Sequence, residues 1–354
     1  MSRVKFGDVV KDVKINIDRL NNPYEYYVAG DHMDSEDLTI HRKGCFTTDD
    51  VGPAFIRVFK PGQILYGSRR TYLKKIAVAD FEGVCANTTF VFETKDPHAF
   101  EQRLLPFIML SKDFTTWSIA KSKGSTNPYV LFSDLADFEF ELPPLEEQKV
   151  LVDKLWAAYR LKEAYKKLLV ATDEMVKSQF IEMFGTVENN THNFPIMTIG
   201  EFANCFAGAT PSTSHPEYWE NGRIRWMSSG EVHKGHVEDT DFRITELGYK
   251  SASTRMVPIH SIVIAIAGQG KTRGTVAITE VDLCTNQSLC AIVPDERVNY
   301  LYLYHNLQGR YLELRGLSGD VNGRGGLNLK IIQKIPVILP PIEKQQQFAS
   351  IAQQ

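Results

Sequence analysis

The chain has 354 residues, which is more than one ordinary domain needs and enough for two domains and a connector. Hydrophobic residues make up 43% and charged residues 23%, which is the composition of a folded globular protein and excludes a largely disordered one. The formal net charge of −3 excludes a global positive field, so any affinity for nucleic acid must come from local basic clusters.

The N-terminal segment Met1 to Asp8 carries charges where a signal peptide would need an apolar core. The longest apolar run, Ile262 to Ala267, is far too short to cross a bilayer. The 5 cysteines are odd in number and lack CxxC spacing, and the 9 histidines lack metal-ligand spacing. We therefore expect a cytoplasmic protein without a disulfide framework or a bound metal.

The first candidate site is a basic segment between two short apolar runs, Ile64–Tyr66 and Ile76–Val78. The runs are typical of strands, so the segment between them is expected to form the tip of a hairpin. Basic side chains at such a tip can contact phosphates or read guanine edges, although an ordinary charged turn fits any single residue equally well. The candidate DNA-binding residues of this tip are Arg69, Arg70, Tyr72, Lys74 and Lys75.

A second candidate loop, Lys121 to Asn127, is expected just before an alternating strand, Phe138–Leu142. Gly124 would let backbone N–H groups approach a phosphate, and Lys121 and Lys123 would add positive charge. A purely structural turn fits this loop equally well.

A long helix is predicted directly after Leu142-Pro143-Pro144. The prolines stop the strand, and Pro144 suits the first turn of a helix because its missing N–H costs nothing there. No glycine or proline interrupts residues 145–184, and Gly185 is well placed as a C-terminal cap. A helix of this length is a rod of about 60 Å.

Apolar residues recur along this helix at spacings of three and four, with polar interruptions. Such a stripe predicts a coiled-coil seam for one partner helix, because a helix this long is not covered by its own domain. The predicted interface residues are Leu151, Leu155, Leu161, Tyr165, Leu168 and Met175.

The second half of the chain repeats the first. The segment Leu339 to Gln345 matches Leu142 to Gln148 at five of seven positions, at an offset of 197 residues. Shorter echoes pair residues 6–9 with 199–202, 76–80 with 276–280 and 85–87 with 284–286, in the same order. A duplicated domain with loop insertions explains this series better than chance.

By this repeat, Gln269 to Gly274 is the counterpart of the first basic tip. Lys271, Thr272 and Arg273 are therefore the candidate DNA-binding residues of a second hairpin. The loop Asn322 to Gly326, which contains Arg324, is expected just before the strand that leads into the second Leu-Pro-Pro.

We therefore predict an α+β protein with two similar domains and a long coiled-coil-forming helix between them. The predicted boundaries are 1–143 for the first domain, 144–185 for the helix, 186–340 for the second domain and 341–354 for the start of a second helix. Only about three turns of that second helix are present, at ~3.6 residues per turn.

This arrangement resembles the specificity subunits of type I restriction–modification systems, in which two target-recognition domains alternate with two helices that open with Leu-Pro-Pro. The first helix of that family commonly ends near Ser-x-Phe-x-x-x-Phe-Gly, which Ser178, Phe180, Phe184 and Gly185 match. The segments Tyr218 to Gly230 and Gly268 to Gly274 are also similar to segments of such domains.

The resemblance implies mixed α/β recognition domains with a twisted β-sheet core that read a bipartite target in double-stranded DNA. It implies methyltransferase and restriction subunits as partners, with the methyl donor, ATP and Mg²⁺ bound in those partners and no catalytic residue in this chain. In the family the two helices pack antiparallel within one chain. Because the second helix is short here, a second copy of the chain or a partner subunit is an alternative source of that helix.

Two other functions remain open at this point. Ala265 to Thr272 satisfies a relaxed P-loop pattern ending in Gly270-Lys271-Thr272, which would indicate a nucleotide hydrolase. The β-branched residues after Arg273 favour a strand over the helix that a phosphate loop needs. The third possibility is a helical scaffold or adaptor that binds no DNA, which salt-sensitive binding to duplex DNA would exclude.

Overall fold

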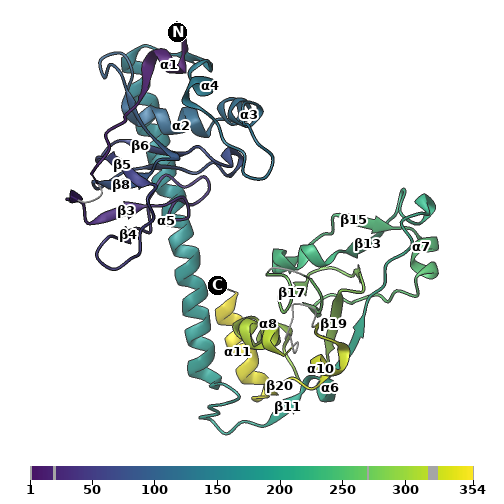
Figure 1. The fold of residues 1–354 in the computed structure, drawn as a ribbon. Helices are drawn as coiled ribbons and strands as arrows, with labels where there is room; N and C mark the ends of the chain where they lie inside the picture. Colours follow the sequence, from purple (N-terminus) through teal and green to yellow (C-terminus); the bar gives the residue numbers. More distant parts are fainter. Residues whose placement is uncertain (1, 19–20, 269–270, 318–325, 354) are drawn as a thin grey trace. The chain divides into compact units, whose positions relative to one another are not determined.

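The long helix predicted from the sequence is present as α5, Leu145–Phe184, and it has no break (Figure 1). It begins directly after the two prolines, where the backbone N–H of Gln148 donates to the carbonyl of Pro144 at 3.0 Å. It ends at Phe184, and the next residue is Gly185, whose φ of 74° is left-handed and where a Cβ atom would lie 2.5 Å from the carbonyl oxygen of Asn189. The predicted glycine cap is therefore confirmed, because only glycine fits this position without strain.

The computed structural model of the chain describes residues 2–18, 21–268, 271–317 and 326–353. These residues form two units, Met1–Tyr165 (unit 1) and Lys166–Gln354 (unit 2), and the boundary between the units falls inside α5.

Unit 1 combines short helices with three small sheets. Its helices, besides the first part of α5, are α1 (Phe6–Val9), η2 (Thr71–Leu73), η3 (Gln102–Leu104), α2 (Leu105–Leu110), α3 (Lys112–Ala120) and α4 (Phe132–Ala136). Its strands are β1 (Ser2–Lys5), β2 (Val10–Asp12), β3 (Tyr26–Val28), β4 (Gly44–Cys45), β5 (Phe55–Phe59), β6 (Ile64–Gly67), β7 (Ile76–Val78), β8 (Gly83–Ala86), β9 (Thr89–Thr94) and β10 (Glu139–Leu142). The sheet orders are β2-β9-β6-β7, β4-β3-β8-β5 and β1-β10.

Unit 2 contains the same kinds of element. Its helices, besides the end of α5, are α6 (Ile199–Phe202), η4 (Pro216–Tyr218), η5 (Ser229–Lys234), α7 (Glu246–Ser251), α8 (Tyr300–Gly309), α9 (Tyr311–Gly316), α10 (Leu329–Gln333) and α11 (Ile342–Ala352). Its strands are β11 (Ile196–Thr198), β12 (Ala203–Ala207), β13 (Ile224–Met227), β14 (His236–Val237), β15 (Phe242–Ile244), β16 (Ile262–Ala265), β17 (Val276–Thr279), β18 (Cys284–Thr285), β19 (Leu289–Pro294) and β20 (Pro336–Ile338). The sheet orders are β12-β19-β16-β17-β14, β15-β13-β18 and β11-β20.

The two units share one topology, which confirms the duplication predicted from the sequence. The order β2-β9-β6-β7 of unit 1 recurs as β12-β19-β16-β17, with antiparallel neighbours throughout. In the second sheet, β3 pairs antiparallel with β4 and parallel with β8, as β13 does with β15 and β18. The pairs β1-β10 and β11-β20 also correspond, whereas β5 and β14 extend only one unit each. The fold class is therefore the predicted one.

A buried glutamine explains why the Leu-Pro-Pro motif recurs in both halves. In unit 1 the side-chain amide of Gln148 donates to the carbonyls of Ala99 and Pro143, at 2.9 and 2.8 Å, and its oxygen accepts from the N–H of Glu101. In unit 2 Gln345 makes the same three bonds, to the carbonyls of Arg297 and Pro340 and from the N–H of Asn299. Both glutamines are fully buried, so each helix start is tied to the segment that leads into the short helices of its unit.

The prediction that two loops lie directly before the strands leading into Leu-Pro-Pro is wrong. The short helix α4 separates residues 121–129 from β10, and α10 lies before β20 in unit 2. Each has only five residues, which is too short for a visible apolar period. The start of α10 is marked by an N-cap: the side-chain oxygen of Asn328 accepts a hydrogen bond from the backbone N–H of Ile331 at 3.0 Å.

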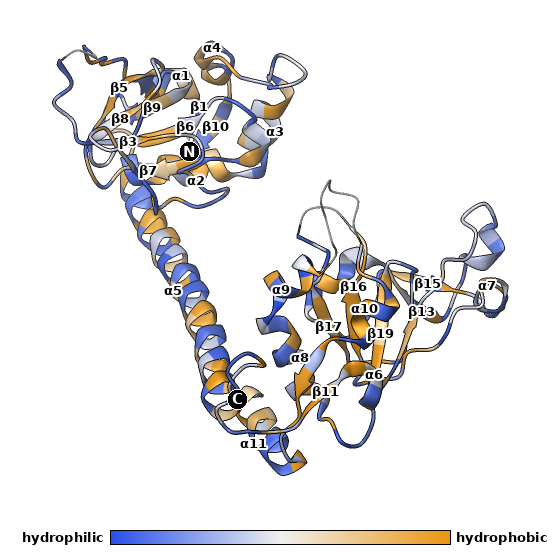
Figure 2. Ribbon diagram, turned by 60° about the horizontal axis from the view of Figure 1, so that its bottom comes forward, coloured by the Kyte–Doolittle hydropathy of each residue, from blue (hydrophilic) through white to orange (hydrophobic). Residues whose placement is uncertain are grey.

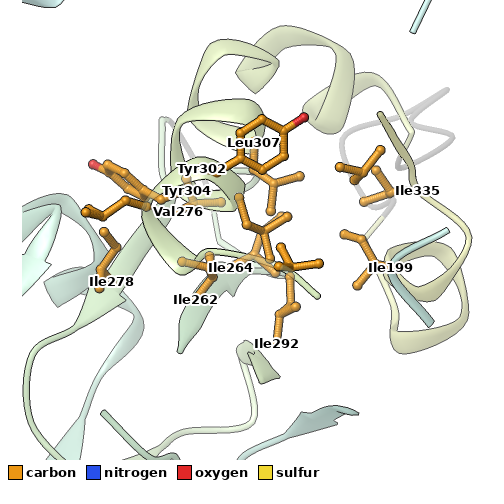
Figure 3. Close-up of a cluster of buried hydrophobic side chains, with 14 of the residues drawn as sticks. Ile199, Ile262, Ile264, Val276, Ile278, Ile292, Tyr302, Tyr304, Leu307 and Ile335 are labelled. Atoms are coloured by element: carbon orange, nitrogen blue, oxygen red, sulfur yellow. The ribbon is translucent and has the colours of Figure 1, made fainter. Parts of the chain in front are cut away.

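Each unit has its own apolar core. In unit 2, isoleucines from the central sheet, including Ile262, Ile264 and Ile292, lie beneath Tyr302 and Leu307 of α8 (Figure 3). In unit 1 the core is built around phenylalanines of the helices and sheet, among them Phe6, Phe92 and Phe114, and the rings of Phe6 and Phe92 meet edge to face at 5.5 Å. Burial of one such large side chain contributes roughly 1.5–3 kcal/mol.

Helix α5 uses different faces for packing and for solvent. Val152 and Tyr159 are buried in the core of unit 1, and Val176, Phe180 and Phe184 are buried in the core of unit 2. Apolar and polar residues alternate along the rest of the helix, as the mixed colouring in Figure 2 shows. Most of its remaining apolar side chains are exposed, including Leu161, Leu168 and Met175.

Candidate nucleic-acid interface

The first predicted hairpin is present, and it is formed by β6 and β7. The pairing is antiparallel, with Ile64 opposite Val78 and Tyr66 opposite Ile76. The connection between them contains the single turn η2, flanked by two left-handed residues, Arg70 with φ of 52° and Lys74 with φ of 47°. Non-glycine residues rarely adopt this conformation, so contacts around the tip must hold it in this shape.

The structure brings the two basic segments of unit 1 together, although residues 76–120 lie between them in the sequence. The N–H of Arg70 donates to the carbonyl of Pro128 at 2.6 Å, and the N–H of Val130 donates to the carbonyl of Ser68 at 2.9 Å. Lys123 and Tyr129 exchange two backbone hydrogen bonds, at 2.8 and 2.9 Å. The tip and the loop 121–129 therefore form one surface, which we call the unit 1 basic surface.

The lysines of this surface are engaged with other protein groups. Lys74 pairs with Glu36 at 2.5 Å and Lys123 with Asp134 at 2.9 Å. The hydrogen bonds from these two lysines hold the pKa values of Glu36 and Asp134 below their ordinary values. Lys75 donates to the carbonyl of Gly30, and the ammonium of Lys121 lies 4.8 Å from the ring centre of Trp117. Exposed pairs of this kind are weak, so DNA phosphates can compete for these lysines.

Arg69 and Arg70 differ from these lysines. Both side chains are exposed, and among the residues that the structure describes none forms a side-chain hydrogen bond or an ion pair with either guanidinium. Two exposed aromatic side chains belong to the same surface, Tyr72 at 52% and Tyr129 at 43% exposure. Tyr129 is a member that sequence reasoning missed, because its position depends on the contact between the loop and the tip.

The second predicted hairpin is formed by β16 and β17, with Ile262 opposite Ile278. Lys271 is exposed, while the hydroxyl of Thr272 lies 3.2 Å from Nε2 of His233. The carbonyl of Lys271 accepts a hydrogen bond from the Tyr311 hydroxyl at 3.0 Å. Arg273 is half-buried and has an interaction with the protein, although its Nε atom is buried without a hydrogen-bond partner among the described residues. Arg324, predicted in the neighbouring loop, lies outside the described residues.

The strand β17 argues against a phosphate-binding loop at Gly270-Lys271-Thr272. A P-loop holds phosphate with the N–H groups at the start of a helix. Here the chain after Thr272 turns at Gly274, with φ of 83°, and enters β17 at Val276. The described residues of this segment, from Lys271 onward, therefore do not support the nucleotide-hydrolase alternative.

Five of the six residues predicted to contact a partner helix on α5 are exposed to solvent. Leu155 is half-buried and packs against the core of unit 1. The other five predicted residues are 42–59% exposed: Leu151, Leu161, Tyr165, Leu168 and Met175. The stripe is therefore an apolar surface of the chain, and its role in binding a partner helix stays a prediction.

A buried polar network in unit 1 was not foreseen from the sequence. The hydroxyl of Tyr159 on α5 donates to Asp37 at 2.6 Å and accepts from the N–H of Leu38 at 2.8 Å. His41 also lies 3.2 Å from Asp37. Burial opposes ionisation of Asp37, but these hydrogen bonds outweigh it and hold its pKa below the ordinary value. Burial and the Asp37 carboxylate raise the pKa of Tyr159 to about 12.

Three residues of this network have the atoms of a possible cation site. Oxygen or nitrogen atoms of Asp37, His41 and Glu163 lie within 4.8 Å of one another. Asp37 also accepts hydrogen bonds from the hydroxyl of Tyr159 and from the N–H of Thr39. Within the described residues, no helix is both long and apolar enough to cross a membrane.

Comparison with known proteins connects both units to one family. The family model described as the type I restriction modification DNA specificity domain matches residues 19–169 and 192–354. The specificity subunit of the type I restriction enzyme EcoR124I/EcoR124II of Escherichia coli is 28% identical over 157 residues, which cover 44% of this chain and 39% of that protein. The specificity subunit of the type I restriction enzyme MjaIX of Methanocaldococcus jannaschii is 30% identical over 161 residues, which cover 44% of this chain and 35% of that protein.

Each of these matches therefore spans less than half of the curated relative. Among solved structures, the S subunit of a type I restriction–modification system from M. genitalium aligns with a TM-score of 0.61 over 99% of this chain and 88% of that chain. Its sequence identity is 16%, so this similarity concerns the fold.

Proposed function

The chain belongs to the type I restriction modification DNA specificity family, and on this premise we propose that it is the DNA-reading subunit of a type I restriction–modification complex. The observation that carries the proposal is the pair of hairpins. Two units of one topology each place basic side chains at the same connection, Arg69 and Arg70 after β6 and Lys271 after β16. Each unit would read one part of a bipartite target in double-stranded DNA.

In this proposal the helix α5 sets the unread gap between the two parts of the target. Its 40 residues make a rod of about 60 Å, which equals one to two turns of duplex at ~34 Å each. The gap would then be a property of the helix, and the two read sequences would be properties of the units.

We propose that the chain itself is not catalytic. The two curated relatives described above are specificity subunits by name. The methyl donor, ATP and Mg²⁺ would bind in methyltransferase and restriction subunits, which are the proposed protein partners. Such a complex would act on DNA in the cytoplasm.

The exposed stripe of α5 is the proposed docking face for a partner helix. In unit 2 the first turns of α11 show how such a face is covered: Phe348 is fully buried, with its ring 5.1 Å from that of Phe180 and 5.7 Å from that of Phe184. The position in unit 1 that corresponds to Phe348, at the same offset of 197 residues as the Leu-Pro-Pro motifs, is Leu151, which is 42% exposed. A helix from a methyltransferase subunit, or from a second copy of the chain, would cover Leu151 and the stripe that follows it.

The test is to co-express the full chain with a type I methyltransferase subunit, purify the complex and map the methylated sites. We expect co-purification, and methylation at a target with two specified parts and a gap of fixed length. Failure of the two proteins to associate, or a methylation pattern that does not change when the chain is omitted, would contradict the proposal.

A second measurement separates DNA reading from a scaffold role. Binding of the full chain or its complex to duplex DNA should weaken steeply as salt rises, because lysines and arginines release counterions from the phosphates. A scaffold that binds no DNA would show no such dependence.

A further inference from the structure

The unit 1 basic surface contains two kinds of cation, and the difference between them bears on how DNA is read. Lys74, Lys75 and Lys123 each donate to an acceptor of the protein, Glu36, the Gly30 carbonyl and Asp134. Arg69 and Arg70 extend from the tip with no such partner in the described part of unit 1. Their five-donor guanidinium groups are therefore available for a partner outside the protein.

The backbone that carries these two arginines is fixed on both sides. Ser68 lies in contact with two segments: its N–H and hydroxyl donate to the Thr88 carbonyl at 3.1 and 2.5 Å, and its own carbonyl accepts from the N–H of Val130. The backbones of Arg69 and Tyr129 form an isolated antiparallel β-bridge, and the N–H of Arg70 donates a hydrogen bond to the carbonyl of Pro128. Specific recognition needs donors held in a defined position, and a backbone braced in this way supplies it.

An arginine at a braced position and a lysine on a flexible stem suit different parts of DNA. A guanidinium presents two parallel N–H groups that match the O6 and N7 acceptors of guanine in the major groove, whereas a phosphate accepts any nearby positive charge. Because β6 is also paired with β9, the part of the β6–β7 hairpin that can approach the major groove is its tip, which carries the two arginines.

We infer that the unit 1 tip reads guanine through Arg69 and Arg70, and that the neighbouring lysines contribute phosphate contacts without base selectivity. This inference rests on the proposed function, because it assumes that the tip meets duplex DNA. The part of the target read by unit 1 therefore contains guanine, at one position for each arginine that enters the groove.

Unit 2 provides a contrast at the equivalent tip. Its described residues place one exposed cation there, Lys271, while Arg273 is half-buried and engaged with the protein. The part of the target read by unit 2 should therefore be unaffected by changes at Arg69 and Arg70. It serves as an internal control within every DNA molecule tested.

The experiment uses the purified complex of the full chain with its methyltransferase subunit. Once the target of the wild-type complex is mapped, a set of duplexes in which each base pair of that target is replaced in turn is compared in competition binding. Arg69→Gln and Arg70→Gln are measured separately, each with a salt titration. Gln removes the charge, and its amide pairs with adenine better than with guanine.

We expect each variant to lose discrimination at one guanine of a single half-site, by roughly 5- to 150-fold, which is the range of one bidentate base contact. The other half-site and the length of the gap stay as in the wild type. Two matched substitutions serve as controls. Arg3→Gln removes an exposed arginine of β1 that is paired with Glu139 of β10, and it should leave the target unchanged. Lys74→Gln removes a charge from the tip itself, and it should weaken all duplexes equally.

Two outcomes overturn the inference while the proposed function stands. In the first, the wild-type complex reads a bipartite target, but Arg69→Gln and Arg70→Gln weaken every duplex by the same factor and reduce the salt slope by about one, which identifies phosphate contacts. In the second, the half-site affected by these variants contains no guanine. If the wild-type complex itself shows no sequence preference, the proposed function fails instead.

Discussion

The starts of α5 and α11 have the same sequence motif but different surroundings. Both follow Leu-Pro-Pro, and both contain a fully buried glutamine with equivalent hydrogen bonds. One turn later they diverge: Phe348 of α11 is buried against the end of α5, whereas Leu151 of α5 is exposed. The motif therefore determines where each helix begins and how it is tied to its unit. Whether its next turn is buried depends on a second helix that the motif does not provide.

The largest effect on stability is expected at the two corresponding positions that differ most in burial, Phe348 and Leu151. Phe348→Ala should destabilise unit 2 by about 3–5 kcal/mol, because it opens a cavity among Phe180, Phe184 and Tyr302. Leu151→Ala at the corresponding exposed site should change the stability of the isolated chain by no more than about 0.5 kcal/mol. Urea unfolding of the purified chain measures both, and equal losses would show that Leu151 is covered in solution.

The shared glutamine should matter equally in the two units. Gln148→Leu and Gln345→Leu each remove the partner of two carbonyls and one N–H, most of which are only partly buried. We expect a loss of about 2–3 kcal/mol for each, since one unsatisfied buried group costs about 1–3 kcal/mol. The same unfolding experiment serves here. A loss in only one unit would mean that the two helix starts are not equivalent.

A third substitution tests the hydrogen bonds that tie α5 to the rest of unit 1. Tyr159→Phe removes the donor to Asp37 and the acceptor for Leu38, and it should cost about 1–3 kcal/mol.

The pH dependence of this substitution gives a second readout. Because the folded pKa of Asp37 is lowered, its contribution is present above the ordinary carboxyl pKa and is lost as the pH falls through the lowered value. Because the folded pKa of Tyr159 is raised to about 12, its contribution is complete below the ordinary phenol pKa and is lost as the pH rises toward 12. The stability difference between wild type and Tyr159→Phe should therefore be largest between these limits. A difference that is constant from pH 3 to neutral would argue against the Asp37 contact.

The smallest effect on the stability of the chain is expected at the exposed stripe of α5. Leu168→Glu places a charge on a side chain that is 59% exposed, so the stability of the chain should change by no more than about 0.5 kcal/mol. Binding of the methyltransferase subunit or of a second copy should nevertheless be lost, because the charge would be buried in a helix interface. Pull-down and light scattering test this, with Lys167→Glu on the same helix as the matched control. Unchanged association would place the docking face elsewhere.

Much of this fold could be predicted from the sequence because its strongest determinants are local. The absence of glycine and proline from residues 145–184 predicts α5, and the repeated motif predicts the common topology. The helices α4 and α10 were missed because five residues show no period. The face of α5 that packs into each unit was also missed, because burial of Tyr159 and Phe180 depends on partners far away in the chain.

The candidate site was predictable in position but not in detail. The apolar runs on either side of Arg69 to Lys75 indicate a hairpin tip. Lys74 and Lys123 are paired because Glu36 and Asp134, which lie in other segments, are close to them, whereas no residue within the described ranges pairs with Arg69 or Arg70. Tertiary contacts of this kind are not visible in a local pattern.

The central claim is that α5 measures the distance between two sequences read by two units. The most direct measurement is to delete residues 166–172, one heptad from the exposed middle of α5, and to map the methylated sites of the resulting complex. A heptad is about 10 Å of helix, or about three base pairs of duplex. We predict a gap shorter by about that amount, with both half-sites unchanged. A gap of the original length, or a change in either half-site, would contradict the account.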